Sequence, residues 1–104
     1  MPQTQYVHVV LFKFKPGVSE KDKDKAVDLI RKFKNMYGVI DVWTGLQINI
    51  ARPGKEHYEL AEIVVFDSRE ALVAHRTDSI HDEIAAHMQR IADWTNPVDF
   101  EVTG

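Results

Sequence analysis

The sequence contains no cysteine among its 104 residues. A disulfide scaffold, a thiolate zinc site, an iron–sulfur cluster and a cysteine nucleophile are therefore excluded. An excess of positive charge is also missing, since 16 acidic residues outnumber 13 lysines and arginines and the net charge is −3. Without a basic field to hold a phosphate backbone, we expect no nucleic-acid partner. Acid–base chemistry would have to come from histidines and carboxylates.

Long apolar runs, repeats and low-complexity segments are absent as well. No stretch approaches the roughly 20 apolar residues of a transmembrane helix, so we expect no membrane partner. The first residues, Met1–Gln5, lack the features of a signal peptide, which favours a cytoplasmic location. The length predicts one domain over residues 1–104. A chain of this size buries roughly two-thirds of its unfolded surface, which leaves little room for a large cavity unless a second subunit helps to close it.

Alternating or β-branched segments predict four strands, and helical spacing predicts two helices between them. Ser19 is expected to cap the first helix and Gly38 to end it. Asp67 and Glu70 form the signature of a capped short helix that ends near His75. A longer helical stretch follows and is expected to be broken at Asn96-Pro97. The expected strands are 6–15, 39–50, 58–66 and 98–102, a loop is expected at 51–55, and the second part of the second helix is expected over 79–93.

This order, β-α-β-β-α-β, predicts an α+β, ferredoxin-like fold with a four-stranded antiparallel sheet and helices on one face. The first strand is largely apolar on both faces, so the face without helices also needs cover. A second copy of the chain is the obvious cover, and we expect a homodimer.

Five histidines are the acid–base candidates. His81 falls inside the apolar arc of its helix, which calls for a polar partner or a cavity. His8 lies on the aromatic face of the first strand, either in a site or as a core histidine with a satisfied hydrogen bond. His75 ends the short helix, either as a cap or in the same cleft. His57 and His87 are expected at the surface.

Glu62 is the most informative carboxylate. It shares a strand face with Tyr58, Leu60, Val64 and Phe66. If that face points inward, Glu62 is a carboxylate in an apolar cleft, and such a group is paired, protonated or functional. The alternative places Glu62 at the sheet edge, facing water.

The chain resembles the stress-responsive dimeric α/β-barrel domain family over essentially its whole length. The order and spacing of several segments carry the resemblance, and no single motif does. The family's usual H-P-x-H pattern is changed here, with Asp78 and Ser79 in its first two positions. The segments are Val7–Lys15, the stretch Asp41–Gly45, the stretch from Phe66 to His81, and Val98–Val102.

The resemblance implies a homodimer whose two sheets close into a barrel, with a cleft between sheet and helices in each subunit. A plant polyketide cyclase of the family works by aldol condensation without a metal cofactor, and its catalytic histidine aligns with His81. Its strand-one pocket histidine aligns with His8, and its catalytic tyrosine with His75. Leu60 replaces another pocket histidine, and Glu62 replaces a pocket valine. The cleft is therefore more polar here, and the cyclase reaction does not transfer directly.

Three functions fit these features. The first is a cofactor-independent enzyme acting on a small carbonyl or polyketide-like compound by cyclisation, isomerisation or lyase chemistry. In it His81 is the general base, His75 or His8 polarises the enolate oxygen, and Glu62 orients a histidine or shares its proton. The second is a non-catalytic dimer that binds a small hydrophobic ligand. The third is a divalent-metal site formed by His8, Glu62 and His81. Seven apolar residues are expected to line the cleft: Val10, Val27, Ile30, Val42, Leu60, Ile84 and Met88.

Overall fold

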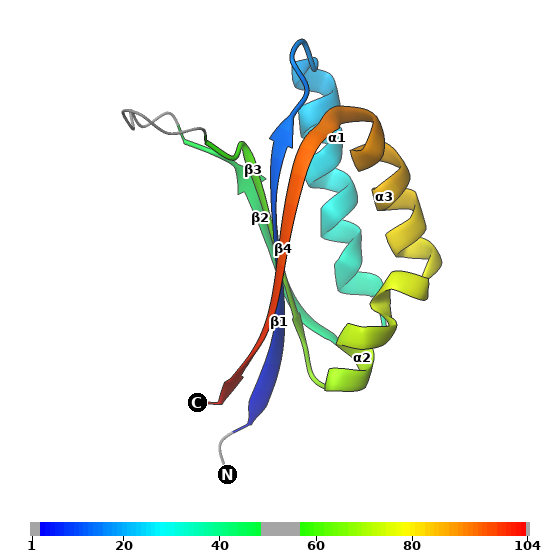
Figure 1. Ribbon diagram of the computed structural model, residues 1–104. Coiled ribbons are helices and arrows are strands. Elements are labelled where there is room, and N and C mark those ends of the chain that lie inside the picture. Colours follow the sequence, from blue (N-terminus) through cyan, green and yellow to red (C-terminus); the bar gives the residue numbers. More distant parts are fainter. Residues whose placement is uncertain (1–2, 49–56, 104) are drawn as a thin grey trace.

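The computed structural model describes residues 3–48 and 57–103. Four antiparallel strands form one sheet in the order β2-β3-β1-β4, and the helices cover one of its faces (Figure 1). This confirms the predicted ferredoxin-like fold. The elements in chain order are β1 (Thr4–Phe14), α1 (Glu20–Ile30), the 3₁₀ helix η1 (Arg31–Asn35), β2 (Val39–Leu46), β3 (Leu60–Phe66), α2 (Arg69–Ala74), the 3₁₀ helix η2 (His75–Thr77), α3 (Ser79–Ile91) and β4 (Ala92–Thr103).

Two helix starts follow from local capping. The Ser19 hydroxyl accepts a hydrogen bond from the backbone N–H of Asp22 at 3.1 Å, as predicted for the cap of α1. The short helix α2 is capped by Ser68 and not by Asp67, because the Ser68 hydroxyl accepts from the N–H of Ala71. The first helix also ends earlier than predicted, since α1 passes into η1 before the chain reaches Gly38.

The last strand is longer than the sequence pattern predicted. α3 ends at Ile91 and β4 begins at the next residue, so Asn96 and Pro97 do not break a helix but lie within the strand. β4 is an edge strand, and an edge strand tolerates proline because half of its backbone groups need no sheet partner. The predicted second and third strands are trimmed to β2 and β3, and the predicted residues 49–50 and the loop at 51–55 lie outside the described residues.

The core lies between the sheet and the helices, as the alternation of β1 predicts. Phe12, Phe14 and Val64 point from the sheet into this layer, where they meet Ile30 and Phe33. The opposite sheet face carries exposed apolar side chains, so no layer formed by residues 3–48 and 57–103 covers it. The exposed residues of this uncovered face are Trp43, Trp94, Val98, Phe100 and Val102. No helix in the described part of the chain is long and apolar enough to span a membrane.

Candidate active site

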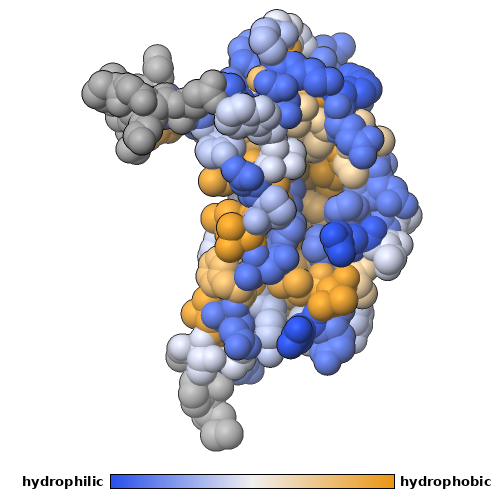
Figure 2. Space-filling view, in the orientation of Figure 1, coloured by the Kyte–Doolittle hydropathy of each residue, from blue (hydrophilic) through white to orange (hydrophobic). Residues whose placement is uncertain are grey.

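A cavity of about 620 Å³ lies between α3 and the half of the sheet formed by β1 and β4. In the space-filling view it is seen as a hollow with apolar atoms between β4 and the helices (Figure 2). Val10, Phe12, Phe33, Ile84 and Met88 give it an apolar lining. Six polar side chains form its polar end: His8, Glu62, His75, Arg76, His81 and Asp99. Gln89, Asp93 and Thr95 also belong to the lining.

A row of three ionisable side chains crosses the sheet at the polar end. Nδ1 of His8 lies 2.5 Å from a carboxylate oxygen of Asp99, the residue opposite it on β4. Because a carboxylate only accepts, Nδ1 carries the hydrogen, and Nε2 of neutral His8 is then an acceptor. That Nε2 lies 3.5 Å from Oε2 of Glu62. His8 is therefore bonded firmly to Asp99 and only loosely to Glu62.

Glu62 is the most deeply buried carboxyl of this row, with 3% of its surface exposed. It lies on β3 opposite Val10 on one side and Thr44 on the other. The Thr44 hydroxyl already donates to the carbonyl of Ala61, so it does not compensate the carboxylate. Burial raises the pKa of Glu62 from 4.5 to about 8. At neutral pH Glu62 is thus mainly a neutral carboxylic acid, which can donate a hydrogen bond.

His75 is held in one tautomer by the backbone. Its Nδ1–H donates to the carbonyl of Leu72, so Nε2 of the neutral ring is an acceptor. That Nε2 is buried and has no hydrogen-bond partner within the described residues. Burial lowers the pKa of His75, and the bond to Leu72 opposes this only in part. In its neutral form His75 therefore offers the cavity an acceptor at Nε2 and not a donor for an enolate oxygen.

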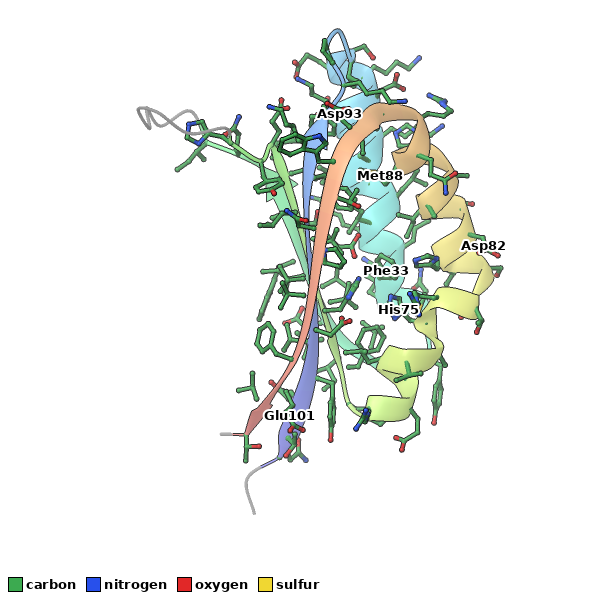
Figure 3. All side chains as sticks on the ribbon, in the orientation of Figure 1. Phe33, His75, Asp82, Met88, Asp93 and Glu101 are labelled. Carbon is green, nitrogen blue, oxygen red and sulfur yellow. The ribbon has the colours of Figure 1, made fainter. Side chains whose placement is uncertain are left out.

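The three cavity histidines stand in a row from the sheet toward α3. The ring centroid of His75 lies 4.6 Å from that of His8 and 5.4 Å from that of His81. Phe33 packs against both His75 and His81, and Figure 3 shows Phe33 and His75 in the layer between sheet and helices. His81 is half-buried, and burial lowers its pKa. A neutral imidazole at the cavity wall can act as a base.

The structure brings together all four predicted catalytic residues. His8, Glu62, His75 and His81 line the cavity, and Glu62 faces inward and not toward water at a sheet edge. Of the predicted apolar lining, Val10, Ile84 and Met88 lie at the cavity.

The other four predicted lining residues lie elsewhere, which corrects the prediction for them. Ile30 and Leu60 are buried in the core, and Val27 and Val42 pack against its edge. The reason is that α1 and η1 close tightly over the β2–β3 half of the sheet, whereas the cavity lies under α3 on the β1–β4 half.

Two further histidines were expected at the surface. His87 is instead 5% exposed between α3 and α1, and its Nε2–H donates to the carbonyl of Asp22 at 3.0 Å. His57 is half-buried and does not line the cavity. Within the described part of the chain, no three histidine or carboxylate side chains are placed to hold one metal ion. The predicted trio His8, Glu62 and His81 thus lines one cavity without forming a ligand set.

The sequence pattern did not identify Asp99 as a site residue. Its partner His8 lies 91 positions away, so only the register of β1 with β4 brings the two together. A signal was present in the sequence, because Asp99 stands between Val98 and Phe100 and therefore lies on the side of the last strand opposite these two apolar residues. Thr95 and Asp99 both belong to that side and line the cavity.

These residues define a ferredoxin-like protein with a partly enclosed acid–base cavity. The family model described as "Stress responsive A/B Barrel Domain" matches residues 7–102. The chain therefore belongs to the stress-responsive A/B barrel domain family, as its resemblance implied.

Solved structures agree on the fold. A dimeric ferredoxin-like protein of unknown function from Thermobifida fusca is 16% identical with a TM-score of 0.84, over 96% of this chain and 92% of its own. The hydroxynitrile lyase from Passiflora edulis is 14% identical with a TM-score of 0.80, over 98% of this chain and 95% of its own. A Dabb family protein from Mesorhizobium loti is 17% identical with a TM-score of 0.73, over 94% of this chain and 96% of its own. No curated protein matches the sequence.

Proposed function

We propose that this protein is a cofactor-independent acid–base enzyme that removes a proton next to the carbonyl group of a small compound. One observation carries the proposal: His81 lines a largely apolar cavity that also contains a His8–Asp99 pair and the buried carboxyl of Glu62. General acid–base catalysis requires an acid and a base whose pKa values differ and which reach the same substrate, as groups that line one cavity can.

His81 is the base in this mechanism. It lies at the cavity wall and burial favours its neutral form. The C–H bond next to the carbonyl breaks, its proton goes to an imidazole nitrogen, and its electron pair forms a C=C bond while charge develops on the carbonyl oxygen. The resulting enolate can cyclise, isomerise or expel a leaving group. His75 packs against the His81 ring and His8 packs against His75 in turn, which restricts where the His81 ring can go.

The relatives support the capacity of this fold for such chemistry. One structural neighbour is named a hydroxynitrile lyase, although 14% identity carries the fold and not the reaction. The plant polyketide cyclase that the sequence resembles has its catalytic histidine at the position of His81. Lyase and cyclase reactions are therefore the first reactions to test.

We further propose that the working unit is a homodimer. Related structures are described as dimeric ferredoxin-like proteins. The uncovered face presents Trp43, Val98 and Phe100 to solvent in one chain, and a second copy would bury this apolar surface and close a barrel.

Hydrogen exchange at carbon tests the proposed reaction without knowledge of the substrate. Acetophenone and other methyl ketones are incubated with the protein in D₂O, and loss of the α-proton signal is followed by NMR. We expect exchange above the buffer rate, reduced at least about 100-fold by His81→Ala. His57→Ala is the matched control, since His57 does not line the cavity. A ketone that binds but exchanges no faster than in buffer would favour the non-catalytic binding protein instead.

A further inference from the structure

Enolate chemistry needs a hydrogen-bond donor for the oxygen, and the two histidines predicted for that role do not supply one. Nδ1–H of His8 is used by Asp99, and Nδ1–H of His75 is used by Leu72. The remaining nitrogen of each neutral ring is an acceptor. Both histidines that the sequence offered for this role are therefore committed to other partners.

The carboxyl of Glu62 has the opposite character. It is 3% exposed, lines the cavity and forms no hydrogen bond to any described residue, while its contact to His8 is 3.5 Å long. A buried carboxyl whose one polar contact is this long keeps much of its desolvation cost, and a bound ligand can reduce that cost. Burial also raises its pKa to about 8, which keeps its proton in place at neutral pH.

Resting on the function proposed above, we propose that Glu62 in its carboxylic acid form donates a hydrogen bond to the carbonyl oxygen of the substrate, and that the substrate is an uncharged carbonyl compound. Glu62 is thereby the group that stabilises the oxyanion as His81 removes the proton. A neutral carboxylic acid in an apolar site is an effective donor for this purpose.

The charges around the cavity agree with an uncharged substrate. Arg76 is the only lysine or arginine of the cavity lining within the described residues, whereas two carboxylates besides Glu62 belong to it. An anionic ligand would be repelled by these carboxylates, and its charge would also disfavour the ionisation of Glu62. The other titratable and charged groups of the cavity lining are His8, His75, Arg76, His81, Asp93 and Asp99.

A binding experiment tests this inference separately from catalysis. Acetophenone, an uncharged ketone, and benzoate, a carboxylate of similar size, are titrated into the protein at pH 6.5 and pH 9, and Kd is measured from NMR shifts. We expect acetophenone to bind at pH 6.5 and to lose about five-fold in affinity at pH 9, the range of one hydrogen bond. Benzoate should bind at least about ten-fold more weakly than acetophenone at pH 6.5.

Two variants make the test specific. Glu62→Gln keeps an N–H donor and should bind acetophenone with the same Kd at both pH values. Glu62→Leu keeps the shape without a donor and should show the weakened Kd at both. Chemical-shift dispersion of the amide spectrum verifies that each variant is folded, and ¹³C labelling of the Glu62 carboxyl reports its titration directly.

Several outcomes would overturn the inference: no binding of acetophenone at pH 6.5, equal binding of benzoate, a wild-type Kd that ignores pH, or a Glu62 carboxyl that titrates near 4.5. His81→Ala separates this inference from the proposed function. If hydrogen exchange is absent but the Glu62-dependent Kd remains, the catalytic proposal fails and the donor role stands. If exchange depends on His81 but the Kd of acetophenone is the same with and without Glu62, only the donor role fails.

Discussion

Replacing Glu62 should change how the stability of the protein depends on pH. Burial raises the pKa of this carboxyl in the folded protein from 4.5 to about 8. Between these values the folded protein holds a proton that the unfolded chain has lost. The contribution to stability is therefore fully present below pH 4.5, decreases as pH rises, and is lost once pH passes about 8.

The size of the effect follows from the same two values. The interval from 4.5 to about 8 corresponds to about 5 kcal/mol at 1.36 kcal/mol per pH unit. Over the accessible range from about pH 5.5 to pH 8 the wild-type free energy of unfolding should fall by about 3 kcal/mol through this group alone. Entry of water into the cavity on ionisation would reduce the figure without changing its sign.

Urea denaturation of wild type and Glu62→Gln at several pH values measures this contribution. The free energy of unfolding of the variant minus that of wild type should increase as pH rises, by about 3 kcal/mol over the range given above. Glu101→Gln is the matched control, because it makes the same Glu-to-Gln change at an exposed carboxyl of β4. A difference between Glu62→Gln and wild type that stays constant with pH would refute the assignment of a protonated, buried Glu62.

Three further predictions address the fold, the assembly and the site. Gly38→Ala should lower the free energy of unfolding by about 2–4 kcal/mol, because Gly38 has φ +81° and a Cβ there would lie 2.4 Å from that of Ala71. Gly17→Ala is the control, since Gly17 has φ +82° but open space around it, and calorimetry should show a loss of only about 1 kcal/mol in the free energy of unfolding. Trp43→Lys should convert a dimer to a monomer in light scattering, and an unchanged mass would contradict the proposed interface. Asp99→Ala removes the acceptor that fixes the tautomer of His8, and it should reduce α-hydrogen exchange about ten-fold or more while amide spectra stay dispersed. Undiminished exchange would exclude a positioning role for Asp99.

The order of elements was predictable because it depends on local periodicity. β1 alternates residue by residue between two apolar faces, and α3 repeats its apolar residues at helical spacing, so neither requires knowledge of distant parts of the chain. The boundaries were less predictable. Pro97 normally ends regular structure, and only the position of β4 at the sheet edge makes proline acceptable there.

The site was predictable where a single strand or helix determines the direction of a side chain. Glu62, His8 and His81 were correctly placed inward on that basis. What local patterns do not contain is the pairing between elements. The Asp99–His8 contact depends on the register of two strands at opposite ends of the chain, and the burial of His87 depends on α1 packing beside α3.

The position of the cavity follows from how two helical layers cover four strands. Over β2 and β3, small and branched residues of α1 pack closely, and Ala26 and Ile30 have no exposed surface. Over β1 and β4, the covering α3 places His81 at the cavity, β1 and β4 place His8 and Asp99 there, and Glu62 of the neighbouring β3 also lines it. Polar groups at these positions prevent tight closure, because each needs a partner or space. The same residues that keep this half of the core open are therefore the residues that can hold and move a proton inside it.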